Sequence, residues 1–318
     1  MAPNETRSSE AVVVVGGGPT GATAGVFTAR YGLDTVVFDR GVSALQRCAF
    51  LENYPGFPGG IDVGTFSDLL CAQIEAAGCT LIEDTVTSVT DAPDGEGFLV
   101  ETGDGRRLET DRVVASAWYD GDYLRPLGGD AMFETHDHGD GEHEHFDPDY
   151  ADDDGRTPVE GLYVAAPAGQ HSVQAVVAAG HGAHVARSLL ADRRADQGYP
   201  DGVAPRYDWM RRDSEFAGEW GDRDRWREWY ESEAGTDHDL DEERFVELRE
   251  RYIDRAFETR VPDEEIEERS REGLRRLVET LGPERVLDAM DEETVRAHVE
   301  SDEGDADSSD GRDAPDTT

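Results

Sequence analysis

The chain contains 318 residues, of which 72 are Asp or Glu and 30 are Lys or Arg, so its formal net charge at pH 7 is −42. Proteins that bind nucleic acid or an anionic membrane need a basic surface, and this composition argues against both partners. No apolar run approaches the ~18 residues of a membrane-spanning helix, and the polar residues 1–10 lack the apolar core of a signal peptide. We therefore expect a cytoplasmic protein.

Arginine supplies all 30 basic residues, and the acidic residues are spread over most of the chain. At moderate salt, so large an excess of one charge strains the compact state by self-repulsion. In about 1 M salt the Debye length falls to roughly 3 Å, and the repulsion is screened. We interpret the composition as a halophilic adaptation to a salt-rich cytoplasm; the alternative is an acidic protein that docks basic partners.

The length suggests about two domains, and the composition and periodicity of the sequence change along the chain. One long region alternates β-branched runs with Gly-rich turns and helical stretches, and the next is rich in Arg, Glu and Asp with helical periodicity. The final segment has no large hydrophobic residue to bury and is expected to be disordered. The predicted parts are a polar tail at 1–10, an α/β domain at 11–195, an α-helical domain at 200–300 and an acidic tail at 301–318.

The most informative stretch of the chain, residues 11–39, is predicted to form a strand, a helix and a second strand. Residues 11–15 (AVVVV) form a β-branched run, typical of a strand buried on both faces of a parallel sheet. The sequence GGGPTG follows at 16–21, and a helix is expected at about 19–31. A second strand at 35–38 ends at Asp39.

The glycines between the first strand and the helix have the spacing G-x-G-x-x-G. In such a motif Gly16 permits the tight turn, Gly18 lets the backbone approach a diphosphate, and Gly21 lets the helix pack on the strand. Asp39 stands where a carboxylate accepts hydrogen bonds from a ribose. A structural Gly-rich turn is the alternative, and the motif does not distinguish FAD from NAD. The residues expected to bind diphosphate and ribose are Gly16, Gly18, Pro19, Thr20, Gly21, Asp39 and Arg40.

Three separated segments carry a family resemblance: ENYPGFP at 52–58, GLYVAA at 161–166 and QAVVAAGHGA at 174–183. With them, the chain resembles the FAD domain of the low-molecular-weight thioredoxin reductases, which are FAD-dependent pyridine-nucleotide-disulfide oxidoreductases. The resemblance implies a Rossmann-like, three-layer α/β domain with a parallel sheet and a small antiparallel β layer. The C-terminal α-helical region would be additional to this domain.

The resemblance also implies that the cofactor is FAD and assigns further contacts. Asn53 would contact the flavin, and the backbone near Val86 would contact the adenine. The helix that begins at Gln174 and Ala175 would direct its N-terminus at the flavin pyrimidine edge, where its dipole favours negative charge.

The sequence departs from the family pattern at several points. The family inserts an NADPH domain with a redox-active C-x-x-C, whereas only about forty residues, 119–158, separate the two halves here, without a cysteine or a second glycine fingerprint. We therefore expect an acidic, His-rich loop in place of that domain. The family's A-T-G reads Ala115-Ser116-Ala117, and its G-D reads Ala166-Pro167, which removes a carboxylate that holds the ribityl chain.

Two residues near the expected flavin are candidates for catalysis. Cys48 is one of three cysteines, too few for a disulfide framework. It follows the second strand, where related flavin reductases carry a redox disulfide, and Arg47 beside it would favour the thiolate. His171 precedes the helix at 174 and is placed to donate a proton. The alternatives are a packed thiol and a loop histidine, and we interpret Cys71 and Cys79 as packing residues.

A histidine-rich segment, THDHGDGEHEHFDPD, contains His136, His138, His143 and His145 in two H-x-H pairs. Imidazoles interleaved with carboxylates are suited to Zn²⁺ or another divalent metal. The spacing matches no known closed structural site. A solvated acidic loop is the alternative, and it is the interpretation that we favour at this point.

The region after residue 200 carries four of the five tryptophans and several amphipathic stripes, such as Trp226, Trp229 and Tyr230. A helical domain that buries its aromatic residues on the FAD domain or on a second subunit explains this pattern. The other interpretation is a lid over the flavin or a docking face for an electron carrier.

Together these observations predict an FAD-dependent oxidoreductase without a pyridine-nucleotide domain or redox dithiol. Its partner would be a small redox protein that donates or accepts electrons, and a homodimer is compatible with the helical region. The alternative is a non-catalytic flavin- or nucleotide-binding module whose helical appendage binds a partner.

Overall fold

The computed structural model describes residues 11–41, 44–117, 121–137, 142–165, 174–206 and 210–308, without the side chains of 136, 137, 142, 143, 148 and 301–308. The chain forms two compact units, Met1–Glu265 and Ile266–Thr318. Among the described helices, none is both long and apolar enough to cross a membrane.

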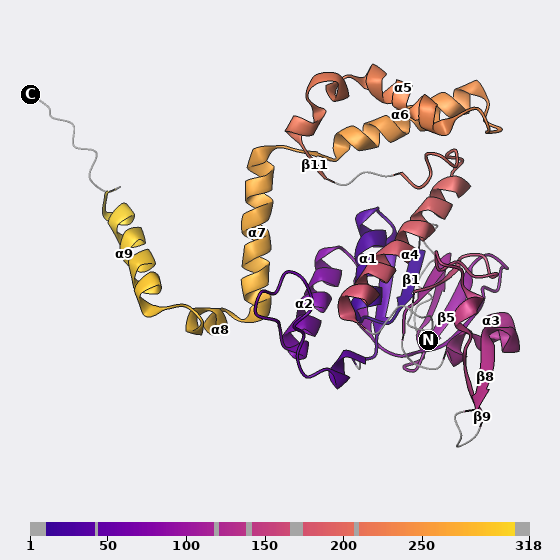
Figure 1. The fold of residues 1–318 in the computed structure, drawn as a ribbon, viewed down its shortest axis with the longest axis horizontal. Helices are drawn as coiled ribbons and strands as arrows, with labels where there is room; N and C mark the ends of the chain where they lie inside the picture. The colour runs from indigo at the N-terminus through magenta and orange to yellow at the C-terminus, as the bar shows by residue number, and fades with distance from the viewer. Residues whose placement is uncertain are drawn as a thin grey trace, which may run out of the picture. The chain divides into compact units, whose positions relative to one another are not determined.

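A five-stranded parallel sheet forms the centre of the first unit (Figure 1). Its spatial order is β10-β7-β1-β2-β3. The central strand pairs on both edges, with Val13 opposite Val36 and Val113. The valine run predicted this parallel, doubly buried strand, and the prediction is confirmed. The strands are β1 (Ala11–Val15), β2 (Asp34–Asp39), β3 (Thr80–Glu83), β7 (Arg112–Ala115) and β10 (Leu162–Val164).

The two faces of β1 pack against different layers, because successive side chains of a strand alternate between faces. Val12 and Val14 belong to a core shared with the helices, and Val13 and Val15 belong to a core shared with a small antiparallel sheet. This arrangement is the Rossmann-like, three-layer α/β fold that the sequence predicts. The helices are α1 (Pro19–Arg30), α2 (Val63–Ala76) and α4 (Ala175–Asp196), and the small sheet contains β4 (Val86–Asp91), β5 (Phe98–Thr102) and β6 (Arg107–Thr110).

Helices α1 and α4 approach closely beside β1 (Figure 1). A Cβ atom built on Gly182 of α4 would lie 2.1 Å from the carbonyl oxygen of Thr20 in α1. Only glycine permits this separation, because a backbone atom cannot be moved aside as a flexible side chain can. The contact fixes α4 against the helix that follows the glycine loop.

The segment between β7 and β10 contains a hairpin where the sequence analysis expects a loop. The strands pair Phe133 with Phe146, and the two rings meet edge to face at 5.9 Å between their centroids. Both rings pack against the core beneath the small sheet, which anchors the hairpin. The elements are η2 (Asp122–Leu124), α3 (Arg125–Gly128), η3 (Gly129–Met132), β8 (Phe133–Asp137), β9 (Glu142–Phe146) and η4 (Pro148–Tyr150).

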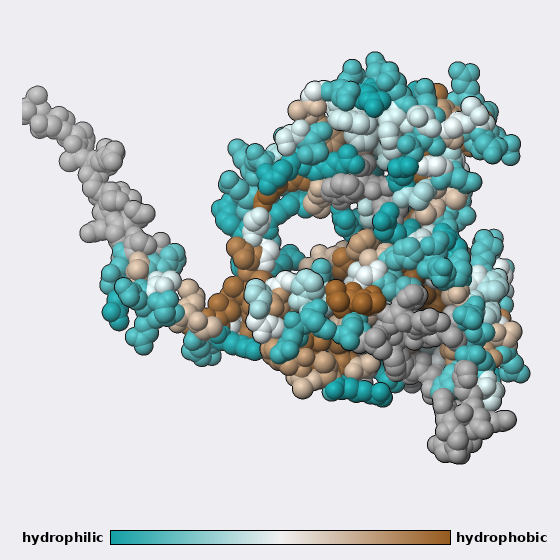
Figure 2. All heavy atoms as spheres, viewed as in Figure 1, coloured by the Kyte–Doolittle hydropathy of each residue, from teal (hydrophilic) through white to brown (hydrophobic). Residues whose placement is uncertain are grey.

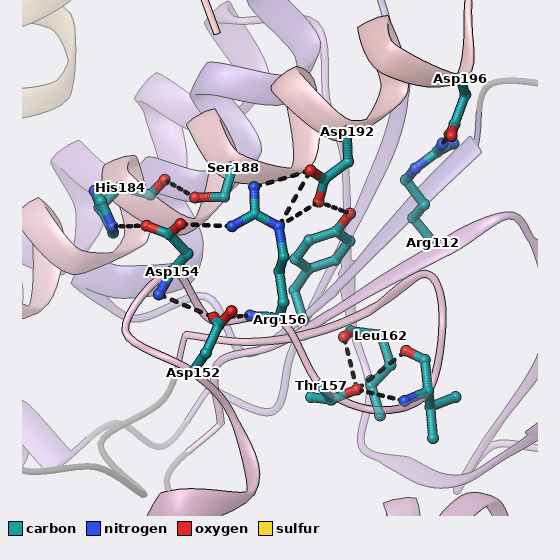
Figure 3. A network of polar contacts seen from close by, with 12 residues as sticks. Arg112, Asp152, Asp154, Arg156, Thr157, Leu162, His184, Ser188, Asp192 and Asp196 are labelled. Atoms are coloured by element: carbon teal, nitrogen blue, oxygen red, sulfur yellow. Dashed lines mark hydrogen bonds and ion pairs between the residues drawn. The ribbon is translucent and has the colours of Figure 1, made fainter. Parts of the chain in front are cut away.

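After the hairpin, the chain is tied to α4 by a network of ion pairs (Figure 3). Asp192 of α4 accepts hydrogen bonds from Arg156 Nε and the Tyr163 hydroxyl, both at 2.8 Å. Arg156 also donates to Asp154, whose other oxygen lies 2.8 Å from His184 Nε2. Burial and the nearby Asp192 carboxylate raise the pKa of Tyr163, so the hydroxyl remains a donor.

Replacing Asp192 with Ala is expected to destabilise the protein by about 1–3 kcal/mol, because the Tyr163 hydroxyl and the Arg156 guanidinium lose their acceptor. Asp196→Ala, one turn later, is the matched control. Its carboxylate also pairs with an arginine, Arg112, but its side chain is 61% exposed against 32% for Asp192. Exposed pairs contribute at most about 1 kcal/mol. Denaturant unfolding at constant high salt measures both values, and equal losses would contradict this ranking.

A separate aromatic core lies in the helical region of the first unit. Trp226 and Tyr230 of α5 are buried against Leu248 and Tyr252 of α6. Hydrogen bonds from Arg227, and further ones from Arg223 and Arg249, outweigh partial burial and lower the pKa of Glu250 to about 2. The elements here are β11 (Arg211–Arg212), η5 (Asp213–Phe216), η6 (Gly218–Gly221), α5 (Arg223–Ala234), α6 (Glu242–Glu258) and β12 (Arg260–Val261), with η1 (Ala44–Arg47) earlier in the chain.

The second unit contains helices whose described side chains form no buried core. Between residues 266 and 300, no described side chain is buried. Apolar residues along α7 and α8 are exposed, as the brown patches in Figure 2 show. The helices are α7 (Asp263–Leu281), which begins in the first unit, α8 (Pro283–Asp288) and α9 (Glu292–Ser308). The α9 backbone therefore extends into the segment expected to be disordered. The domain boundaries stay predictions.

Candidate functional site

A cleft of about 640 Å³ opens where the parallel strands end. In open α/β sheets, ligands bind in the crevice outside the carboxyl ends of the strands. Segments that follow β1, β2, β3 and β7 all contribute to its wall. The cleft brings together most of the site residues predicted from the sequence: Gly16, Gly18, Pro19, Thr20, Asp39, Arg40, Cys48, Asn53, Gln174 and Ala175.

The glycine loop is held against the end of β7. Gly16 has a φ of +110°, and a Cβ atom there would lie 3.0 Å from the backbone of Ala117. A Cβ atom on Gly21 would lie 1.8 Å from the Gly16 carbonyl oxygen. The Ser116 hydroxyl donates to the carbonyl oxygens of Val15 and Gly16 at 2.8 and 3.1 Å. Thus Ser116, where the chain departs from the family's A-T-G, holds the loop in place.

Helix α1 begins directly at the cleft with Gly18 as its N-cap and Pro19 in the first turn. No described side chain caps this terminus, and its first turn contains no acidic residue. The positive end of the helix dipole therefore faces the cleft without a carboxylate in that turn to offset it. Such a terminus favours a phosphate group.

The middle glycine of the loop has a role that the sequence analysis missed. A Cβ atom on Gly17 would lie 2.6 Å from Asp39 Cβ and 2.7 Å from Asp39 Oδ2. The Asp39 side chain therefore rests against the loop, and its Oδ1 accepts a hydrogen bond from the Gly41 backbone at 3.1 Å. The motif leaves the position of Gly17 open, so the only sequence signal was that three glycines, 16–18, follow one another.

Asn53 and Gln174 meet at another part of the cleft wall. The Asn53 side-chain amide donates to Gln174 Oε1 at 2.5 Å, although 121 residues separate them. Val86 does not line the cleft and is 1% exposed, so its side chain is a core residue; the predicted contact concerned its backbone. His171 and the Ala166-Pro167 pair lie outside the described residues.

Of the three cysteines, only Cys48 is exposed, and its thiol lies 3.4 Å from the Phe50 carbonyl oxygen at the cleft. Cys79 is buried, and burial raises its pKa to about 11. The pKa of Cys71 is raised by burial and then by the Asp39 carboxylate. Both thiols are therefore protonated at neutral pH, in keeping with a packing role.

Asp84 is a cleft residue that the sequence analysis did not select. It is 9% exposed, and its Oδ1 accepts a hydrogen bond from the Thr85 backbone at 2.7 Å. Burial opposes its ionisation, but hydrogen bonds from Thr102 and nearby backbone groups, with the charge of Arg106, lower its pKa. An acidic residue directly after the third parallel strand was the available signal.

The comparisons with known proteins give local sequence similarity. No protein-family model matches the chain. One curated relative, from Streptomyces clavuligerus, is 42% identical over 81 residues, or 24% of this chain and 25% of the relative. Another, from Listeria innocua, is 48% identical over 107 residues, or 32% of each chain. Both relatives are thioredoxin reductases. The chain spans about a fifth to a third of the length of the curated relatives it matches.

Solved structures give a second comparison. A thioredoxin reductase from Gloeobacter violaceus is 18% identical, with a TM-score of 0.47, over 63% of this chain and 97% of that chain. A thioredoxin reductase from Giardia duodenalis is 17% identical, with a TM-score of 0.44, over 60% of this chain and 100% of that chain.

Proposed function

We propose that the cleft binds FAD and that the chain is an FAD-dependent oxidoreductase related to the thioredoxin reductases. One observation carries the proposal: the glycine loop, Asp39 and the Asn53–Gln174 pair, which come from distant parts of the sequence, line a single cavity. Its volume, about 640 Å³, falls within the range of small-molecule sites. The local identity with thioredoxin reductases supports the resemblance from which FAD is inferred.

The residues of the cleft fit a flavin dinucleotide part by part. The uncapped start of α1 and the glycine backbone suit the diphosphate, because they leave no Cβ atom between ligand and chain. Asp39 suits the adenosine ribose, and Asn53 with Gln174 suits the flavin end. Bound FAD supplies hydride-transfer or single-electron chemistry, and the chain positions it.

The proposed electron donor is a small redox protein rather than NADPH held in a domain of this chain. Between β7 and β10, the described residues form short helices and one hairpin. No two of the three cysteines have the spacing C-x-x-C. We infer that electrons reach the flavin from outside the chain, with Cys48 and His171 as the candidate catalytic residues.

Visible spectroscopy of the protein purified in high salt tests this proposal. We expect flavin absorption bands, either as purified or after added FAD and gel filtration, and bleaching by dithionite. Among NADH, NADPH and reduced ferredoxin, we expect reduced ferredoxin to bleach the bound flavin. If the protein never retains FAD, the proposal that FAD is its cofactor is wrong.

The same spectra separate the enzyme from its alternative, a non-catalytic flavin-binding module. The raised pKa values of the half-buried Cys71 thiol and the buried Cys79 thiol favour that alternative, because neither thiol is poised for thiolate chemistry. Bound flavin that dithionite reduces but no biological donor or acceptor affects would support the module and refute the oxidoreductase.

A further inference from the structure

Carboxylates outnumber basic groups in the described wall of the cleft, as they do in the whole chain. Asp39, Glu52 and Asp84 line it, against two arginines, Arg40 and Arg47. The diphosphate of a dinucleotide is negatively charged, so these carboxylates repel it unless a nearby cation compensates. The start of a helix supplies only a partial positive charge. A cleft of this composition therefore needs a full cation to bind a dinucleotide.

The two arginines of the cleft differ in their partners. Arg40 already interacts with another group of the chain. The exposed Arg47 guanidinium forms no hydrogen bond or ion pair with any residue that the structure describes. Many other described arginines, such as Arg156 and Arg227, are paired with carboxylates. In a chain with 72 acidic and 30 basic residues, an arginine at the cleft without a carboxylate partner is available to an anionic ligand.

Hydrogen bonds tie the segment that carries Arg47 to the proposed ribose site. The Gln46 side chain donates to the Gly41 carbonyl oxygen at 3.2 Å. The Gly41 backbone in turn donates to Asp39 Oδ1 at 3.1 Å. Arg47 follows Gln46 directly, so these bonds hold it near the carboxylate that rests against the glycine loop.

The neighbours of Arg47 also lie near the glycine loop. Leu45 and Cys48 line the cleft, and both line a smaller cavity of about 400 Å³ as well. Gly17 and Gly18 are shared between the same two cavities. The Cys48 backbone donates to the Leu45 carbonyl oxygen at 2.8 Å, which closes the turn containing Arg47. Arg47 therefore belongs to a defined turn beside the loop that is proposed to bind the diphosphate.

We propose that Arg47 binds the diphosphate of FAD, together with the glycine loop and the start of α1. A guanidinium is suited to this role because it can donate two parallel N–H···O bonds to phosphate oxygens. The inference rests on the proposed FAD function and uses described residues alone. Metal binding by the histidine-rich segment, in contrast, stays a hypothesis, because His138 and the side chains of His136 and His143 lie outside the described residues.

Arg47→Gln tests the contact, because it removes the charge and keeps a polar side chain. We expect about a tenfold loss of FAD affinity, the size of effect that one charged hydrogen bond produces. Titration of the apoprotein with FAD at constant high salt, followed by flavin fluorescence, measures it. Arg30→Gln is the matched control, since Arg30 is exposed at the end of α1 and does not line the cleft. That variant should bind FAD like the wild-type protein.

Fragments of FAD identify the part of the ligand that Arg47 contacts. ADP-ribose contains the adenosine and the diphosphate, whereas adenosine contains no phosphate. In competition against FAD, Arg47→Gln should weaken ADP-ribose binding about tenfold, as for FAD, and should leave adenosine binding unchanged. Circular dichroism verifies that the variant is folded.

Three results would overturn the contact and leave the FAD proposal intact. They are an unchanged FAD affinity in Arg47→Gln, an equal loss of adenosine binding, and a loss of FAD binding without a loss of ADP-ribose binding. A wild-type protein that binds no FAD would instead refute the proposed function, and this inference with it.

Discussion

Asp39→Ala is expected to weaken FAD binding by about 10- to 100-fold without unfolding the protein. A hydrogen bond to a charged group contributes about 1.5–3 kcal/mol, and each 1.4 kcal/mol is a factor of ten in affinity. Asp39 lies at the end of β2, lines the cleft and is held by the Gly41 backbone. Equilibrium titration of the apoprotein with FAD, followed by flavin fluorescence, measures the change.

Asp34→Ala is the matched control for the loss of one negative charge. Asp34 lies on the same strand but is exposed at its opposite end. Its removal should leave FAD affinity within about twofold, because surface charges far from a site are screened in high salt. If both variants lose the same affinity, net charge is responsible and the ribose assignment of Asp39 is wrong.

Gly17→Ala tests whether the loop positions that carboxylate. The added methyl group would lie 2.6–2.7 Å from Cβ, Cγ and Oδ2 of Asp39, so the side chain must move. Gly17→Ala should therefore weaken FAD binding in the same direction as Asp39→Ala. The double variant should lose less than the sum of the two effects, because both changes remove one interaction. Strict additivity would show that Gly17 acts independently of Asp39.

Gly182→Ala is expected to destabilise the first unit by about 2–3 kcal/mol. Its Cβ atom would lie 2.1 Å from the Thr20 carbonyl oxygen and 2.8 Å from the Thr20 carbonyl carbon, and both are backbone atoms. The two helices must separate to admit a methyl group, which has a cost typical of overpacking. Because Thr20 also lines the cleft, weaker FAD retention should accompany the loss of stability.

Gly180→Ala, two residues earlier in α4, is the matched control. A Cβ atom at Gly180 has nothing within 4 Å. Alanine is favoured over glycine within a helix by about 0.5–1 kcal/mol, so this variant should be slightly more stable than the parent chain. Denaturant unfolding compares the two. A Gly182→Ala variant as stable as Gly180→Ala would contradict the close packing of α1 and α4.

Local sequence patterns were sufficient to predict the helix and strands around the glycine loop. The run of valines, the G-x-G-x-x-G spacing and Asp39 predicted a buried strand, a turn and a helix, and β1, α1 and β2 follow in that order. These features are readable from sequence because strand alternation, helix periodicity and glycine conformations depend on neighbouring residues. The resemblance to the thioredoxin reductases extended the prediction to Asn53 and Gln174.

Other parts of the site depend on contacts between distant segments. Asp39 approaches Gly17 closely, and Asp84 lies at the cleft wall. Both arrangements arise only when β2, β3 and the glycine loop come together. The His-rich segment looked like a solvated loop because its spacing matches no closed site. In the structure, Phe133 pairs with Phe146 across a hairpin, and their contact depends on tertiary packing that the spacing of the histidines does not indicate.

By itself, the amino-acid sequence determined the strand, glycine turn and helix that open the α/β domain, because these follow from interactions within about thirty residues. The resemblance to the thioredoxin reductases implied the three-layer fold around them. Only the tertiary structure decided which residues share the cleft, why Gly182 cannot be larger, and how Asp192 secures the chain after the hairpin. These depend on close approaches between segments far apart in the chain, such as Asn53 and Gln174. Tertiary packing sets such distances, and they cannot be read from the spacing of residues in the sequence.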